Sequence, residues 1–344
     1  MRFQPATTTH LDAAAADWRA FGGPRYRSFR ALAVAQGSIG ALTGPAIVIP
    51  LLLELGAHPA LATALAVLPI VGTVAQRALP GLLDRTDGNL RGIAVLFATL
   101  GEPRGLLLAA VIGAVALGWL PAWATIALVA LVSGVLGSMG AISYGLIQVW
   151  YGIILPEEER RLVAPRLGGI TMGVGSVILL PIALTIDGLL DGVGLWAYVI
   201  PLAVAGVAGL VAATAVRRLP APGRVRVPKR STWAEADALR LRRLGNVLSL
   251  ASLAAGLSPF LTVYAMAVLG SGPGFAIAIS AVSSATLVLS SLFVSSHLRD
   301  GSASRLLRAS FVLRAAALFA GLLAHPANPL APAVLIVIAV LLAA

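Results

Sequence analysis

The chain has 344 residues, of which 58% are apolar and only 11% are charged, and it contains no cysteine. A soluble domain cannot bury that much hydrocarbon, so the composition predicts an all-α, polytopic membrane protein and excludes disulfides and cysteine nucleophiles. The formal net charge is +11. The basic residues lie in short loops between apolar runs, which favours anionic membrane lipids over nucleic acid as partners.

Ten apolar runs follow a charged segment at residues 1–30, which is predicted to be a cytoplasmic amphipathic segment without a cleaved signal peptide. The stretch from Gly105 to Pro156 has no charge and is too long for one span, and Pro121 is its natural turning point. The predicted spans cover residues 31–53, 59–80, 105–121, 125–154, 167–186, 194–216, 244–269, 275–297, 309–324 and 329–344.

The basic residues fall in alternate loops once Arg77 and Arg314, each inside the end of a span, are assigned to the nearer surface. The positive-inside rule then predicts a cytoplasmic N-terminus in the cell (plasma or inner) membrane. This assignment leaves no ionisable residue near a span centre. A basic cytoplasmic loop at 217–243 divides six predicted spans at 31–216 from four at 244–344.

An Asp-Gly turn follows the second run of each part, at Asp87-Gly88 and at Asp300-Gly301, which favours a parallel repeat of two halves. The stretch around the first turn is similar to the loop signature of the major facilitator superfamily, through Gly81, Asp84, Arg85, Gly88 and Arg91. The match is displaced by one residue at Asp84 and Arg85. An ordinary solvated turn is the alternative to a loop that controls conformation.

This resemblance implies a bundle of two six-helix halves that transports a solute by alternating access. The chain ends inside an apolar run at Ala344, so we expect a fragment without helices eleven and twelve, with a shortened ten-helix form as the alternative. The antiporter signature that the family carries in helix five is not reproduced near Gly175 and Pro181.

Polar residues inside the first, fourth and seventh runs are the candidate substrate ligands, because these helices line the central cavity of the resembled family. Tyr144, Gln148 and Tyr151 share one helical face through their i, i+4, i+7 spacing. The first run adds Gln36 and Thr43, and the seventh adds Thr262 and Tyr264. Hydrogen bonding between helices is the alternative role. Glycines of the fourth and fifth runs, including Gly140, Gly168 and Gly169, are expected to allow close helix approach.

Glu54, near the outer end of the first run, is the candidate coupling group for a proton, with a headgroup anchor as the alternative. We expect a secondary transporter that exports a neutral or amphiphilic small molecule, without enzymatic activity, cofactor or metal. The alternatives are a membrane-embedded enzyme and a degenerate transporter homologue with a structural or regulatory role.

Overall fold

The computed structural model describes residues 26–65, 79–155, 157–220, 258–297, 312–313, 316–317, 319–320 and 323–343. These residues form helices and connecting turns, with no strand among them, which confirms the all-α prediction. Most of the predicted N-terminal segment and of the basic central loop, together with Arg77, Arg314 and Asp300-Gly301, lie outside the described residues.

Six helical segments of the described chain are long and apolar enough to cross a membrane, as expected for an integral membrane protein. They match the first, third, fourth, fifth, sixth and eighth predicted runs, and cover Arg27–Glu54, Leu90–Ala116, Ala122–Ile154, Arg166–Val193, Trp196–Arg217 and Pro273–Ser290. Two shorter apolar helices, α13 (Ser258–Ala267) and α16 (Ala331–Ala343), lie within the seventh and tenth runs. The count of ten spans and the two-half arrangement stay predictions.

The third span begins well before its predicted start at residue 105. Helices α6 (Leu90–Gly101) and α7 (Arg104–Ala116) form one segment that is interrupted only at Glu102 and Pro103. The prediction took the charges of Glu102 and Arg104 as the end of a loop, and it was wrong there because the preceding helix is itself apolar. The predicted turn at Pro121 is confirmed, since this residue is the N-cap of α8 (Ala122–Leu131).

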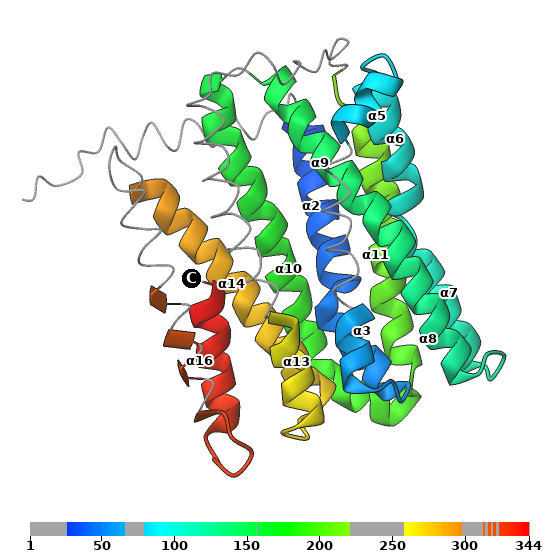
Figure 1. Cartoon of the computed structure of the whole chain (residues 1–344), viewed down its shortest axis with the longest axis vertical. Coiled ribbons are helices and arrows are strands. Elements are labelled where there is room, and N and C mark those ends of the chain that lie inside the picture. The colour runs from blue at the N-terminus through cyan, green and yellow to red at the C-terminus, as the bar shows by residue number, and fades with distance from the viewer. Residues whose placement is uncertain are drawn as a thin grey trace, which may run out of the picture.

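The helices pack as one bundle (Figure 1). Helix α11 (Trp196–Arg217) lies against α2 (Arg27–Leu42), α6 and α7, and α2 also packs along α10 (Glu157–Val193). Helix α10 then contacts α14 (Pro273–His297), which carries α16 on its other side. The longest helix–helix contact, between α10 and α14, therefore joins the two predicted halves.

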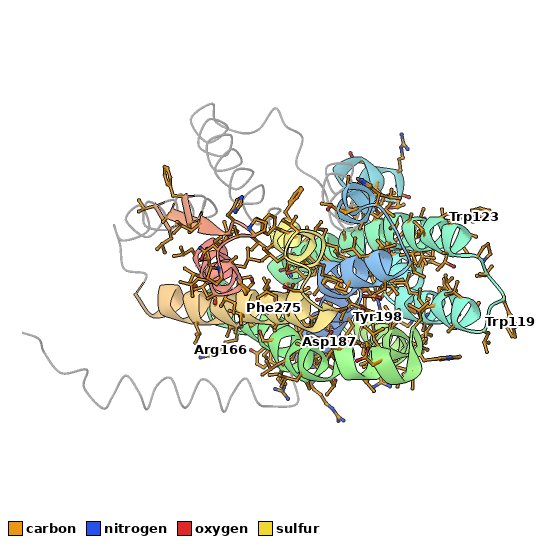
Figure 2. All side chains as sticks on the ribbon, turned by 90° about the horizontal axis from the view of Figure 1, so that it is seen from below. Trp119, Trp123, Arg166, Asp187, Tyr198 and Phe275 are labelled. Carbon is orange, nitrogen blue, oxygen red and sulfur yellow. The ribbon has the colours of Figure 1, made fainter. Side chains whose placement is uncertain are left out.

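Charge differs between the two ends of the bundle. Arginines cluster where α2 and α6 begin and α11 ends, whereas Glu54, Asp187 and Asp191 lie toward the opposite end (Figure 1). Trp119, in the turn between α7 and α8, and Trp123, in the first turn of α8, are each 75% exposed (Figure 2). Exposed tryptophans at a span end are typical of the membrane–water interface.

Asp187 joins α10 to the start of α14, because its Oδ1 accepts a hydrogen bond of 2.8 Å from the backbone N–H of Gly274. The carboxylate thereby satisfies a free donor at the helix N-terminus and complements its dipole. Changing Asp187 to Ala is expected to lower the free energy of unfolding by about 1 kcal/mol. Thermal unfolding in detergent measures the loss, and Asp191→Ala, an exposed carboxylate one turn away, is the matched control. Equal losses in both variants would contradict the capping role.

Candidate functional site

Three spans are not regular α-helices throughout their length. The first is interrupted between α2 and α3 (Pro45–Glu54), and the third between α6 and α7. The fourth contains a π-helical turn at Val132–Leu136, labelled η3, between α8 and α9 (Gly137–Ile154). Irregular backbone at membrane depth is stable only where protein or a polar cavity surrounds it, and π turns are frequent at functional sites.

Proline and glycine explain two of these breaks. Pro45 is the first residue of α3 and has no N–H to donate, while Gly44 before it adopts an extended conformation. Pro103 is the N-cap of α7 and follows Glu102, whose backbone is still in the helical region. Because proline removes the hydrogen bond to the preceding turn, backbone carbonyls near Gly101 become available to side chains.

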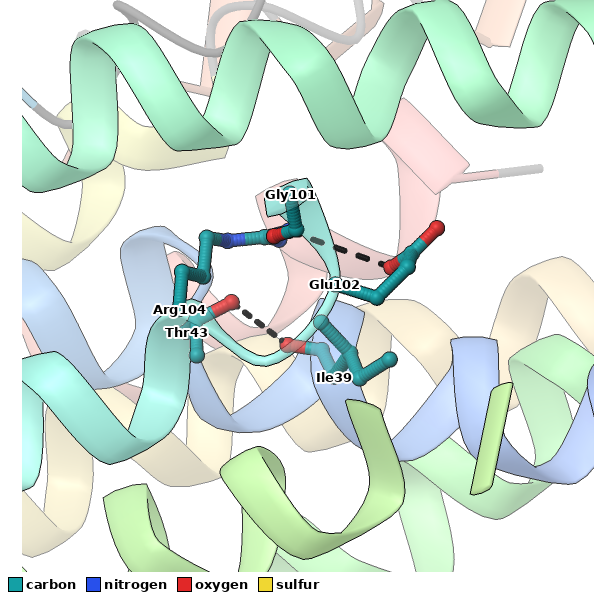
Figure 3. Close-up of polar contacts among 5 residues, drawn as sticks. All are labelled: Ile39, Thr43, Gly101, Glu102 and Arg104. Carbon is teal, nitrogen blue, oxygen red and sulfur yellow. Dashed lines mark hydrogen bonds and ion pairs between the residues drawn. The ribbon is translucent and has the colours of Figure 1, made fainter. Parts of the chain in front are cut away.

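Glu102 and Arg104 form a buried ion pair at the break in the third span (Figure 3). Arg104 Nη1 lies 4.0 Å from Glu102 Oε2 and donates a hydrogen bond of 3.2 Å to the carbonyl of Gly101. The side chains are only 12% and 5% exposed. Within the segment Leu90–Ala116, twelve residues precede Glu102 and fourteen follow it. The inference that no ionisable residue lies near a span centre was therefore wrong.

The pair is enclosed by helices that approach closely through glycine. A Cβ atom at Gly140 of α9 would lie 2.7 Å from Arg104 Nη1. A Cβ atom at Gly209 of α11 would lie 2.6 Å from the Cα of Pro103 and would also overlap the backbone of Glu102. Arg104 therefore points toward α9, and α11 covers the break from the other side.

A small polar cavity lies between α2, α9 and α10. Its volume is about 70 Å³, and it is lined by Ala33, Gln36, Tyr144, Gln148, Tyr151, Leu167, Gly168 and Thr171. The structure thus brings together four of the seven predicted substrate ligands. Gln36 Nε2 is buried without a hydrogen-bond partner among the described residues, so it has a free donor. Tyr144 lies one turn beyond Gly140, where Arg104 meets α9.

Thr171 closes the cavity between α2 and α10. Its hydroxyl lies within hydrogen-bonding distance of two carbonyls, 3.2 Å from that of Ala33 and 2.9 Å from that of Leu167. The backbone of Thr171 also contacts Gly37 so closely that no Cβ could fit there. The cavity wall therefore depends on contact between the first and fifth spans.

The other three predicted ligands lie elsewhere. Thr43 donates its hydroxyl to the carbonyl of Ile39 at 2.8 Å, within its own helix (Figure 3). Thr262 is 1% exposed, and Tyr264 donates to the carbonyl of Ala324. Tyr264 also lines a separate, apolar cavity of about 540 Å³ beside α13 and α16.

The predicted coupling and loop residues lie at the two ends of the bundle. Glu54 is exposed as the last residue of α3. Asp84 and Arg85 are exposed at the end of α5 (Leu79–Arg85). Neither residue forms an ion pair with another described residue. Gly81 lies in the same helix.

The turn that follows has a structural role that the sequence did not predict. Gly88 has φ of 72°, a left-handed conformation that favours glycine. Arg91 Nη2 donates to the backbone carbonyl of Arg217 at 2.9 Å and so satisfies the C-terminal end of α11.

The buried pair of Glu102 and Arg104 and the two buried serines of the fourth span were not among the predicted functional residues. Ser133 in the π turn and Ser143 in α9 each have a hydroxyl without a partner among the described residues. A signal was present, because the apolar stretch before Glu102 is long enough to join the one after Arg104. Comparisons with protein-family models, curated proteins and solved structures find no match to this chain.

Proposed function

We propose that the protein is a secondary active transporter of the major facilitator type, which moves a small organic solute across the plasma membrane by alternating access. The observation that carries this proposal is a polar cavity whose lining includes two spans, one of which is interrupted and the other of which contains a π turn. Discontinuous helices at the bilayer midplane free backbone groups and are typical of transporter binding sites. Here other turns of the first span, which is interrupted at Gly44, and of the fourth span, which contains the π turn, line the polar cavity. The broken third span places an ion pair beside the fourth.

The cavity is too small for a solute in this conformation, and Tyr144 and Gln148 are exposed at its edge. At about 10–15 Å³ per water, 70 Å³ holds about five water molecules but no larger organic solute. A solute enters only if α2, α9 and α10 separate. The contact of Thr171 with Ala33 is a direct barrier to that separation, because it joins the first and fifth spans.

Glu102 replaces Glu54 as the proposed coupling group. Burial of a carboxylate within a span is costly, and such groups mark proton and substrate pathways by default. Protonation of Glu102 would release Arg104 from its ion pair and change the charge beside Gly140. Glu54 lies exposed at a helix end, where a headgroup anchor is the simpler role.

The charge difference between the two ends supports a cytoplasmic start of α2, because arginines concentrate at that end. Export of a neutral or amphiphilic solute is the proposed direction, in keeping with a cavity lined by tyrosine and glutamine.

Gln148→Ala tests the proposal. Proteoliposomes that contain the full chain are exposed to a panel of neutral and amphiphilic solutes, and the resulting charge movement is recorded on a solid-supported membrane. For a solute that gives a signal, the variant is expected to raise the half-saturating concentration about fivefold, as expected for the loss of one hydrogen bond of about 1 kcal/mol. The neighbouring Val149→Ala is the matched control, since Val149 is 41% exposed and does not line the cavity.

Two outcomes would contradict the proposal. If no solute of the panel produces a signal above that of protein-free vesicles, the transport activity is not supported. If Gln148→Ala and Val149→Ala shift the half-saturating concentration equally, the cavity is not the binding site.

A further inference from the structure

We infer that one anionic phospholipid binds in a groove between the start of α2 and the end of α11. The groove has a volume of about 460 Å³, within the range of ligand sites. It is lined by Arg27, Ser28, Ala31, Val207, Leu210, Val211, Thr214, Ala215 and Arg218. This site is separate from the polar cavity and does not depend on transport.

The two arginines supply the recognition of a phosphate group. Arg27 and Arg218 are exposed at one end of the groove, and within the described residues neither is paired with a carboxylate. Guanidinium groups bind phosphate through paired, charge-assisted hydrogen bonds. Arg27 is also the first residue of α2, so the positive end of the helix dipole adds to the attraction for an anion.

Arg217 and Arg91, which lie near this groove, donate hydrogen bonds to other groups and do not line it. Arg217 Nη2 donates to the hydroxyl of Thr99 at 3.2 Å, and Arg91 is bonded to the carbonyl of Arg217. Thr214 uses its hydroxyl proton on the carbonyl of Leu210 at 2.8 Å. The positive charge that remains at the groove therefore comes from Arg27 and Arg218.

The apolar part of the groove has the length of one membrane leaflet. Arg218 lies eleven positions after Val207, a rise of about 16 Å at 1.5 Å per residue, which is close to half of a hydrocarbon core of about 30 Å. Val207, Leu210 and Val211 are 56%, 50% and 47% exposed on a membrane-spanning helix. An acyl chain can cover these side chains while its headgroup reaches the arginines. A soluble anion would leave them uncovered.

Native mass spectrometry of the full chain in detergent, with phosphatidylglycerol or phosphatidylcholine added, tests the site. Arg27→Gln and Arg218→Gln are each expected to raise the dissociation constant for phosphatidylglycerol about tenfold. Arg85→Gln removes one charge at the same end but outside the groove, and it should leave the constant unchanged. Phosphatidylcholine should bind weakly to all forms.

Leu210→Trp tests the apolar part without a change of charge. The larger side chain fills the groove and is expected to raise the dissociation constant for phosphatidylglycerol about tenfold. Leu184→Trp, at an exposed position of α10, is expected to leave this constant unchanged. Equal losses in the three arginine variants would mean nonspecific attraction and overturn the site. Unchanged binding of phosphatidylglycerol to Leu210→Trp would place the lipid outside the groove, and this result would also overturn the proposed site.

Discussion

Replacing Arg104 with methionine is expected to lower the free energy of unfolding by about 3–5 kcal/mol, because it leaves the carboxylate of Glu102 buried without its partner. The variant also removes the hydrogen bond to the carbonyl of Gly101, which the break before Pro103 leaves exposed to side chains. The double variant Glu102→Leu with Arg104→Met is expected to recover most of this loss, since an apolar pair of similar volume carries no buried charge.

Thermal and denaturant unfolding of the wild type, Glu102→Leu, Arg104→Met and the double variant in the same detergent complete a double-mutant cycle. The coupling energy between the two positions is expected to exceed about 1 kcal/mol. Arg85→Met is the control, an exposed arginine whose loss should change stability by less than about 0.5 kcal/mol. If the single and double variants are equally destabilised, Arg104 does not stabilise the charge of Glu102. The cycle is independent of any transport substrate.

The sequence predicted the helical class and six of the helical segments that are long and apolar enough to cross a membrane, because apolar runs of span length are a strong signal. It also placed Tyr144, Gln148 and Tyr151 on one face, and the structure arranges all three around one cavity with Gln36. Helical periodicity fixes such neighbours within a single helix. It says nothing about which other helix supplies the partner, and Thr262 and Tyr264 accordingly lie elsewhere.

The sequence could not predict the buried pair for a physical reason. Glu102 and Arg104 flank a proline, a pattern that is more typical of a loop than of a span centre. Their burial depends on mutual pairing and on glycines of two other helices, Gly140 and Gly209. Composition within one segment does not contain that information.

Close helix approach was predicted correctly at some glycines and not at others, because it depends on a neighbouring helix that one segment of sequence does not specify. A Cβ atom at Gly140 would meet Arg104, as expected for a close approach, but at Gly168 and Gly169 it would meet nothing within 4 Å. The spacing of glycines identifies a helix face that can pack closely. Only the neighbouring helix decides whether that face is used.

Gly209 gives the sharpest test of how α11 holds the break in the third span. A Cβ atom there would overlap the backbone of Glu102 and lie 2.6 Å from the Cα of Pro103. Backbone atoms cannot move aside as a flexible side chain can. Gly209→Ala is therefore expected to lower the free energy of unfolding by about 2 kcal/mol, although alanine is the better helix former.

Gly188→Ala is the matched control, because this glycine lies inside α10 with nothing within 4 Å of the added Cβ. It should stabilise the protein by up to about 1 kcal/mol through helix propensity alone. Thermal unfolding in one detergent measures the change in the free energy of unfolding for both variants. Changes of opposite sign would show that α11 packs directly against the break in the third span. If both alanines stabilise the protein, α11 and the third span are farther apart than the geometry of Gly209 requires, and the enclosure of Glu102 and Arg104 is looser than described.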